Sequence, residues 1–225
     1  MEFDNSLEKR IKKGIDYIES NNLTEAQKLF EDIANDKKSE LIGYLFLGII
    51  QIKIKNFTVA KSFFNKILII EPDNQDANLN LGLVFLEEKN YEKAILFFDK
   101  VIKNSKNNFN AHYHRGLSYF LIKKYDAAID SFKACIDLNK DFYHSYLNLG
   151  HIYLRTKNFE KSIDNYNKVL NYEPKHNNAK FNLAWNYFAL MKLDIAFKYY
   201  EFRSGKINPS PKFLEMNKKF QPKEW

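Results

Sequence analysis

Residues 75–108 read QDANLNLGLVFLEEKNYEKAILFFDKVIKNSKNN, and the rest of the chain repeats their pattern. Gly82 recurs at intervals of 34 residues, at Gly14, Gly48, Gly116 and Gly150, and the next step reaches Ala184. A small and an aromatic column keep the same interval: Ala26, Ala60, Ala94, Ala128, Ser162 and Ala196; Phe30, Phe64, Phe98, Phe132, Tyr166 and Tyr200. A fixed period of this length is typical of a solenoid, in which each unit packs on its neighbours. The columns therefore predict one continuous array.

Each unit holds two apolar stretches with the spacing of an amphipathic helix. In the third unit these are Leu79, Leu83 and Leu86, then Ala94, Phe97, Phe98 and Val101. Gly82 and Ala94 are expected to be small because the two helices approach closely there, and Phe98 is expected to fill the space between hairpins. The turn between the helices carries asparagine, which tolerates the left-handed conformation that ends a helix, at Asn22, Asn56, Asn90 and Asn158.

The period and the small columns resemble the tetratricopeptide repeat. The resemblance covers residues 7–210, in units 7–40, 41–74, 75–108, 109–142, 143–176 and 177–210. The fifth unit is the fullest, with Tyr146, Leu149, Gly150, Tyr153, Phe159, Ser162, Tyr166 and Pro174. The second unit also keeps the early aromatic residue, Tyr44, and the closing proline, Pro72, whereas the other four units lack both. The resemblance implies an all-α fold: a right-handed α-solenoid of six helix-turn-helix hairpins over residues 1–210, and a short C-terminal helix or tail over 211–225.

The sequence and its composition limit the cellular locations that are expected for the chain. No basic segment followed by an apolar core is visible at the N-terminus, as a signal peptide would require. The most apolar run, residues 41–52, is too short to span a bilayer. The single cysteine, Cys135, excludes an intramolecular disulfide and falls in a packing column with Ile33, Ile67, Val101 and Val169. We therefore expect a cytoplasmic protein without membrane insertion.

The net charge of +7 raises the question of whether the chain binds nucleic acid. The lysines are scattered in pairs and interleaved with Glu and Asp, whereas a nucleic-acid binder carries a basic stripe on one face. We expect solvated surface and no nucleic-acid partner, with a preference for acidic protein partners left open.

No catalytic signature is visible in the sequence: it has no Gly-rich phosphate loop, no zinc-type cysteine pair and no nucleophile elbow. We therefore predict no enzymatic activity in these residues and no cofactor. His114, His144 and His151 are expected on adjacent first helices, but no carboxylate or cysteine completes a metal site with them. They are interpreted as polar groove residues.

The strongest functional lead is the column of Asn80, Asn148 and Asn182, with His114 in the fourth unit. In a stacked array the first helices line the concave face, so equivalent residues form a ladder. An asparagine amide offers donors and an acceptor that match a peptide backbone. The column is similar to the asparagine ladder in the repeat region of protein O-linked glycosyltransferases. The alternative is that these amides only solvate a groove.

Apolar residues flank this column on the first helices, and a share of them is expected to pack against neighbouring helices. They are Leu79, Leu83, Tyr113, Leu117, Leu147, Phe181, Trp185 and Phe188. Together with His151, the remainder would anchor partner side chains. The carboxylate clamp of some tetratricopeptide repeats needs Lys and Asn in the groove; it is not predicted here, because those positions hold Ile11, Ile15, Leu79 and Leu83.

The C-terminal end resembles bacterial proteins in which such repeats precede a glycosyltransferase domain. The matching segments are Tyr200-Glu201-Phe202-Arg203 and Pro222…Trp225. The sequence thus predicts a protein-interaction scaffold that binds an extended peptide or partner segment in its concave groove. The alternative is the substrate-recognition region of a glycosyltransferase whose catalytic domain lies outside these residues.

Overall fold

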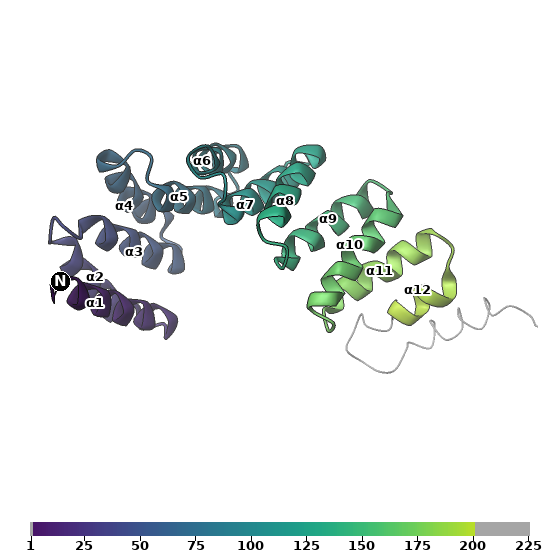
Figure 1. Ribbon diagram of the computed structural model, residues 1–225, viewed down its shortest axis with the longest axis horizontal. Coiled ribbons are helices and arrows are strands. Elements are labelled where there is room, and N and C mark those ends of the chain that lie inside the picture. The colour runs from purple at the N-terminus through teal and green to yellow at the C-terminus, as the bar shows by residue number, and fades with distance from the viewer. Residues whose placement is uncertain (1, 201–225) are drawn as a thin grey trace, which may run out of the picture. The chain divides into compact units, whose positions relative to one another are not determined.

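The computed structural model describes residues 2–200, with side chains from residue 6 onward, and every regular element in this range is an α-helix (Figure 1). The helices are α1 (Glu2–Glu19), α2 (Leu23–Ala34), α3 (Glu40–Lys53), α4 (Phe57–Ile70), α5 (Gln75–Glu87), α6 (Tyr91–Asn104), α7 (Phe109–Leu121), α8 (Tyr125–Leu138), α9 (Tyr143–Arg155), α10 (Phe159–Tyr172), α11 (Asn177–Ala189) and α12 (Leu193–Tyr200). Each predicted repeat holds two of them, so the all-α repeat architecture is confirmed. The C-terminal helix predicted within residues 211–225 lies outside the described residues.

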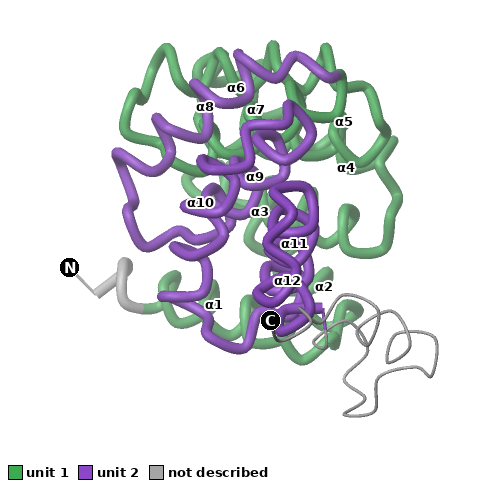
Figure 2. Tube along the Cα trace, turned by 90° about the vertical axis from the view of Figure 1, so that its right-hand side faces the viewer, with its two compact units in different colours: residues 1–122 green, residues 123–225 purple. Residues whose placement is uncertain are grey.

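The described part of the chain forms two compact units, residues 2–122 and 123–200 (Figure 2). In the first unit each helix from α1 to α7 packs on the next, and α5 also contacts α3 and α7. In the second unit each helix from α8 to α12 packs on the next, and α9 also contacts α11. The first helices α3, α5 and α7 thus lie against one another in succession in the first unit, as α9 and α11 do in the second.

A glycine lying under an aromatic ring sets the closest approach within a hairpin. A Cβ atom placed on Gly82 would lie 2.5 Å from a ring carbon of Phe98, far inside van der Waals contact. The same overlap recurs at Gly14 under Phe30, Gly48 under Phe64 and Gly150 under Tyr166. The close approach predicted at the glycine column is therefore confirmed, and the group that approaches is the aromatic residue of the second helix.

The aromatic column also reaches the next hairpin. Phe30 stacks on Phe46 of α3 with ring centroids 4.5 Å apart, and Phe98 stacks on His114 of α7 at 5.8 Å. Phe30 and Phe98 are fully buried. One ring therefore packs on the glycine of its own hairpin and on the first helix of the hairpin that follows. Cys135 is fully buried, as its packing column predicts.

The turns inside the hairpins correct the sequence prediction. The left-handed residue lies one position before each of the four expected asparagines, and one position before the lysine that replaces asparagine in the other two turns. These residues are Asn21, Lys55, Lys89, Lys123, Lys157 and Met191, with φ between 57° and 62°. Asn90 itself has φ −92°, and its side chain accepts a hydrogen bond from the Lys93 N–H. Its own N–H donates back to the Phe85 carbonyl at 2.8 Å. The asparagine therefore begins the second helix, and its predecessor ends the first.

Lys89→Gly is expected to raise the free energy of unfolding by up to about 1 kcal/mol, because glycine adopts a left-handed backbone without the steric cost of a Cβ atom. Glu87→Gly, at the last residue of α5, is the matched control and should lower it by up to about 1 kcal/mol, because Glu87 is helical and gains nothing from a left-handed backbone. Chemical denaturation followed by circular dichroism measures both. A loss of stability in Lys89→Gly would contradict the turn geometry.

Gly82→Ala is expected to lower the free energy of unfolding by about 1–3 kcal/mol, because the new methyl group overlaps the Phe98 ring. Phe98→Leu in the same chain removes part of the ring and should make the added methyl group less costly. Denaturation of the two single variants and the double variant gives this coupling directly. Strictly additive losses would place the overlap elsewhere.

Candidate peptide-binding surface

The predicted polar column lies on first helices that contact one another within each unit. Asn80 on α5 and His114 on α7 occupy equivalent positions of two packed helices in the first unit. Asn148 on α9 and Asn182 on α11 do the same in the second unit. All four side chains are half-buried. The structure thus places the column on two pairs of packed helices, one pair in each unit.

Two of the amides are held by the same local hydrogen bond. The Asn80 amide nitrogen donates to the Asp76 carbonyl at 2.8 Å, and the Asn148 amide nitrogen donates to the His144 carbonyl at 2.9 Å. Each bond reaches one turn back along the helix and uses one of the two amide hydrogens. It therefore fixes the plane of the amide at equivalent positions of α5 and α9.

The third asparagine is held by a neighbouring first helix instead. The Asn182 amide nitrogen lies 3.0 Å from the Nε2 atom of His151, which makes the imidazole the acceptor. Burial lowers the pKa of His151, and the positive charge of Arg155 lowers it further, so the neutral ring needed for this bond is favoured. The structure thus joins His151 and Asn182, two of the predicted site residues, across α9 and α11.

His114 is more deeply packed than its place in a polar column suggests. Its ring stacks on Phe98 and meets Tyr113 edge-on, with centroids 5.8 Å and 5.1 Å apart. Its Nδ1 atom is buried and has no hydrogen-bond partner among the described residues. Burial lowers the pKa of His114 to about 4, so the ring is neutral at pH 7.

The predicted apolar flank divides into packed and exposed residues. Leu147 packs against the core of the second unit. The other members are half-buried, except Trp185, whose side chain is 51% exposed. Its indole meets Phe181 and Phe188 edge-on, and both of these rings lie against Tyr200. Trp185 is thus the rim of an aromatic group formed by α11 and α12.

The structure also bears on metals and membranes. Among residues 2–200, no group of three or more His, Cys, Asp or Glu side chains has a geometry that could hold a metal ion. Within the same range, no helix has the combined length and apolar character needed to cross a bilayer.

Sequence reasoning missed an exposed apolar hollow between α5 and α6, lined in part by Phe85, Leu96 and Phe97. The signal that could have found it is Leu96, which stands in a column that is otherwise polar.

Two family models match the sequence. The model of "Anaphase-promoting complex, cyclosome, subunit 3" matches residues 53–135, and that of "Tetratricopeptide repeat" matches residues 143–176. No curated protein matches significantly.

Several solved structures share the fold. A crystal structure of MamA is 25% identical, with 77% of this chain and 95% of MamA covered and a TM-score of 0.66. MamA from Desulfovibrio magneticus RS-1 is 20% identical, with coverages of 75% and 96% and a TM-score of 0.65. YrrB, described as a TPR (tetratricopeptide-repeat) protein with an unusual peptide-binding site, is 17% identical, with coverages of 84% and 97% and a TM-score of 0.68.

The hairpin architecture and these matches define the class of the chain: a helical-repeat scaffold protein. More particularly, residues 143–176 match the tetratricopeptide repeat, and the helical hairpins have the fold of a solved tetratricopeptide-repeat protein.

Acidification is expected to destabilise the fold in part through His114. Unfolded histidine titrates near its ordinary pKa of 6.5, whereas folded His114 titrates near 4. The unfolded state therefore binds more protons between these values, so stability is full above about pH 6.5 and falls by roughly 3 kcal/mol towards pH 4.

His114→Asn places the residue of the third, fifth and sixth repeats at this position and removes the titrating ring. Denaturation at pH 7 and pH 4.5 should show a smaller acid loss than in the parent chain. His112, His144 and His151, whose pKa values burial also lowers, remain in both proteins. An unchanged acid loss would mean that the His114 ring is already accessible to protons in the folded state.

Proposed function

We propose that this protein binds an extended peptide segment of a partner protein along its first helices. The amides of Asn80, Asn148 and Asn182 hydrogen-bond the peptide backbone. The observation that carries the proposal is the repeated back-bond at Asn80 and Asn148, at 2.8 Å and 2.9 Å, which orients two equivalent amides alike. Backbone recognition of this kind needs fixed donors and acceptors rather than side-chain pockets.

The spacing of the helices fits an extended peptide. Packed helices lie about 8–10 Å apart, and an extended chain advances about 3.3–3.6 Å per residue. Amides on two packed first helices, such as Asn148 on α9 and Asn182 on α11, therefore meet about every third residue of the peptide. Side chains between these points are left free, so binding tolerates different peptide sequences.

The aromatic group at the C-terminal end supplies a place for one anchoring side chain. Trp185 is half-exposed beside Phe181 and Phe188, and large aromatic residues dominate binding energy at many interfaces. Leu79, Leu83, Tyr113 and Leu117 supply apolar wall in the first unit. His114 packs beneath the column, and His151 orients Asn182.

Two further observations agree with this proposal. The similar protein YrrB is described as having a peptide-binding site. The net charge of +7 favours acidic segments through long-range attraction. A cytoplasmic location is part of the proposal.

A second candidate function is substrate recognition for a glycosyltransferase. It is favoured by the sequence resemblance of Tyr200-Glu201-Phe202-Arg203 and Pro222…Trp225, of which all but Tyr200 lie outside the described residues. The coding frame beyond Trp225 tests it. A frame that continues into a Gly-rich α/β pattern would support this function, and an immediate stop codon would remove it.

Replacing Asn80, Asn148 and Asn182 together by alanine is expected to lower the affinity for peptides selected on the parent chain at least about tenfold. Each hydrogen bond contributes about 0.5–1.5 kcal/mol, and each 1.4 kcal/mol is a factor of ten. Peptides are selected by display on the full chain, and affinity is measured by fluorescence anisotropy.

Asn165→Ala is the matched control. Asn165 lies on the second helix α10 and makes the same back-bond, from its amide to the Lys161 carbonyl at 2.8 Å. This variant should bind the selected peptides like the parent chain. Unchanged binding by the triple variant, with the helical circular-dichroism signal intact, would discard the asparagine column as the binding site.

A further inference from the structure

An open hollow of about 570 Å³ lies on the surface of the α5–α6 hairpin. It is lined by Phe85, Lys93, Leu96, Phe97, Asp99, Lys100 and Lys103. Phe85 and Phe97 stack at its base with centroids 5.3 Å apart. Leu96 stands at its edge with 62% of its side chain exposed. The hollow thus combines an apolar base with a lysine rim.

Leu96 breaks the pattern of its own column. The equivalent positions in the other five repeats hold exposed polar residues, namely Lys28, Ser62, Asp130, Asp164 and Lys198. The fold therefore does not require an apolar residue here, because five of six repeats place a polar one at the same helical position. An exposed leucine beside two aromatic rings exposes apolar surface that is typical of an interaction site.

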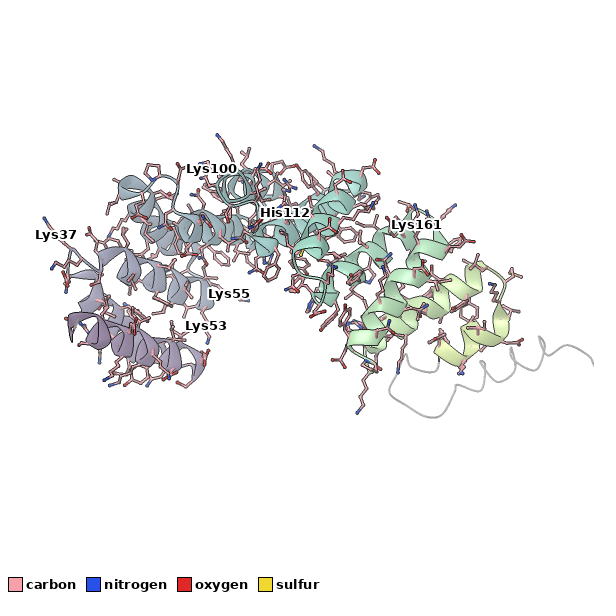
Figure 3. The ribbon with its side chains drawn as sticks, in the orientation of Figure 1. Lys37, Lys53, Lys55, Lys100, His112 and Lys161 are labelled. Carbon is pink, nitrogen blue, oxygen red and sulfur yellow. The ribbon has the colours of Figure 1, made fainter. Side chains whose placement is uncertain are left out.

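The charge of the rim is unbalanced. The Nζ atom of Lys93 lies 5.4 Å above the ring of Phe85, and that of Lys100, labelled in Figure 3, lies 4.9 Å above the ring of Phe97. Among the described residues, no carboxylate is within 4.0 Å of Lys93, Lys100 or Lys103.

The carboxylate that lines the hollow, Asp99, already has a partner, as does Glu88 in the same hairpin. Asp99 binds Arg115 at 2.9 Å, and Glu88 at the end of α5 binds Lys61 at 2.6 Å. Three lysines therefore remain to be matched by negative charge from outside the chain.

We propose that this hollow is a second docking site, which takes an acidic segment of a partner protein with one large apolar side chain among its carboxylates. The apolar side chain packs on Leu96 and the Phe85–Phe97 pair. The flanking carboxylates meet Lys93, Lys100 and Lys103. Charge complementarity selects this occupant, because an apolar base inside a cationic rim fits neither a basic nor a purely polar peptide.

The site is separate from the asparagine column. Phe85 follows Asn80 by five residues, which places the two side chains about 140° apart around α5. The proposal therefore stands on its own observations and does not depend on peptide binding along the first helices.

The test uses the full chain and two fluorescein-labelled acidic peptides that differ only at one central residue, leucine or serine. The leucine peptide is expected to bind about tenfold more tightly than the serine peptide, because it buries an apolar side chain. In two-dimensional NMR it should shift the backbone amide signals of Leu96 and Lys100 and leave that of Asn80 in place. Leu96→Asp should abolish the difference between the peptides.

Ser62→Asp is the matched control, since it adds the same charge at the equivalent exposed position of another repeat. The fold should tolerate Leu96→Asp, because two other repeats have aspartate at the equivalent position, as Asp130 and Asp164. The proposal is overturned if Ser62→Asp weakens the leucine peptide equally, or if the two peptides bind alike. Equally tight binding of a single-stranded oligonucleotide, or Leu96-dependent dimerisation in sedimentation, would assign the hollow to a different occupant.

Discussion

The contact between a glycine on the first helix and an aromatic ring on the second controls the geometry of every hairpin in which it occurs. At Gly82 a single added carbon would come within 2.5 Å of the Phe98 ring, so the two backbones stand as close as the ring permits. Because protein interiors are close-packed, a contact of this kind tolerates little variation in helix spacing. Its recurrence under Phe30, Phe64 and Tyr166 explains why the hairpins are alike.

The same rings connect one hairpin to the next, which is why the repeats stabilise one another. Phe30 reaches Phe46, and Phe98 reaches His114, each on the following first helix. With the core contacts made by the buried columns, the exposed and half-buried positions of the first helices are free to vary. Asn80 and Asn148 occupy equivalent positions of this kind, and the side-chain amide of each donates a hydrogen bond to the backbone carbonyl one turn back along its own helix.

Much of the fold follows from the sequence because the period is strict and the packing columns are chemically narrow. The 34-residue interval, the two helices per unit and the burial of Cys135 all depend on residue size at fixed positions. The left-handed turn residue was misplaced by one position, because four of its six occupants are lysines, which carry no intrinsic preference for that conformation. The left-handed conformation is instead favoured by the turn itself, in which the Asn90 N–H donates a hydrogen bond to the Phe85 carbonyl at 2.8 Å.

The candidate site was less predictable, because it depends on side-chain direction and burial. The sequence pointed to Asn182 and His151 separately, but the hydrogen bond between them requires particular rotamers. The depth of His114 follows from the position of Phe98 rather than from its own identity. Leu96 does not follow from the repeat pattern, because it differs from the polar residues at the equivalent positions of the other five repeats.

The most direct test of the binding surface is NMR of the side-chain amide groups while a display-selected peptide is titrated into the full chain. Asparagine NH₂ signals report on the amides themselves, separately from the backbone. The account predicts that the signals of Asn80, Asn148 and Asn182 shift with a common affinity while that of Asn165 on α10 stays in place. If the NH₂ signal of Asn165 shifts while those of Asn80, Asn148 and Asn182 do not, the account is contradicted.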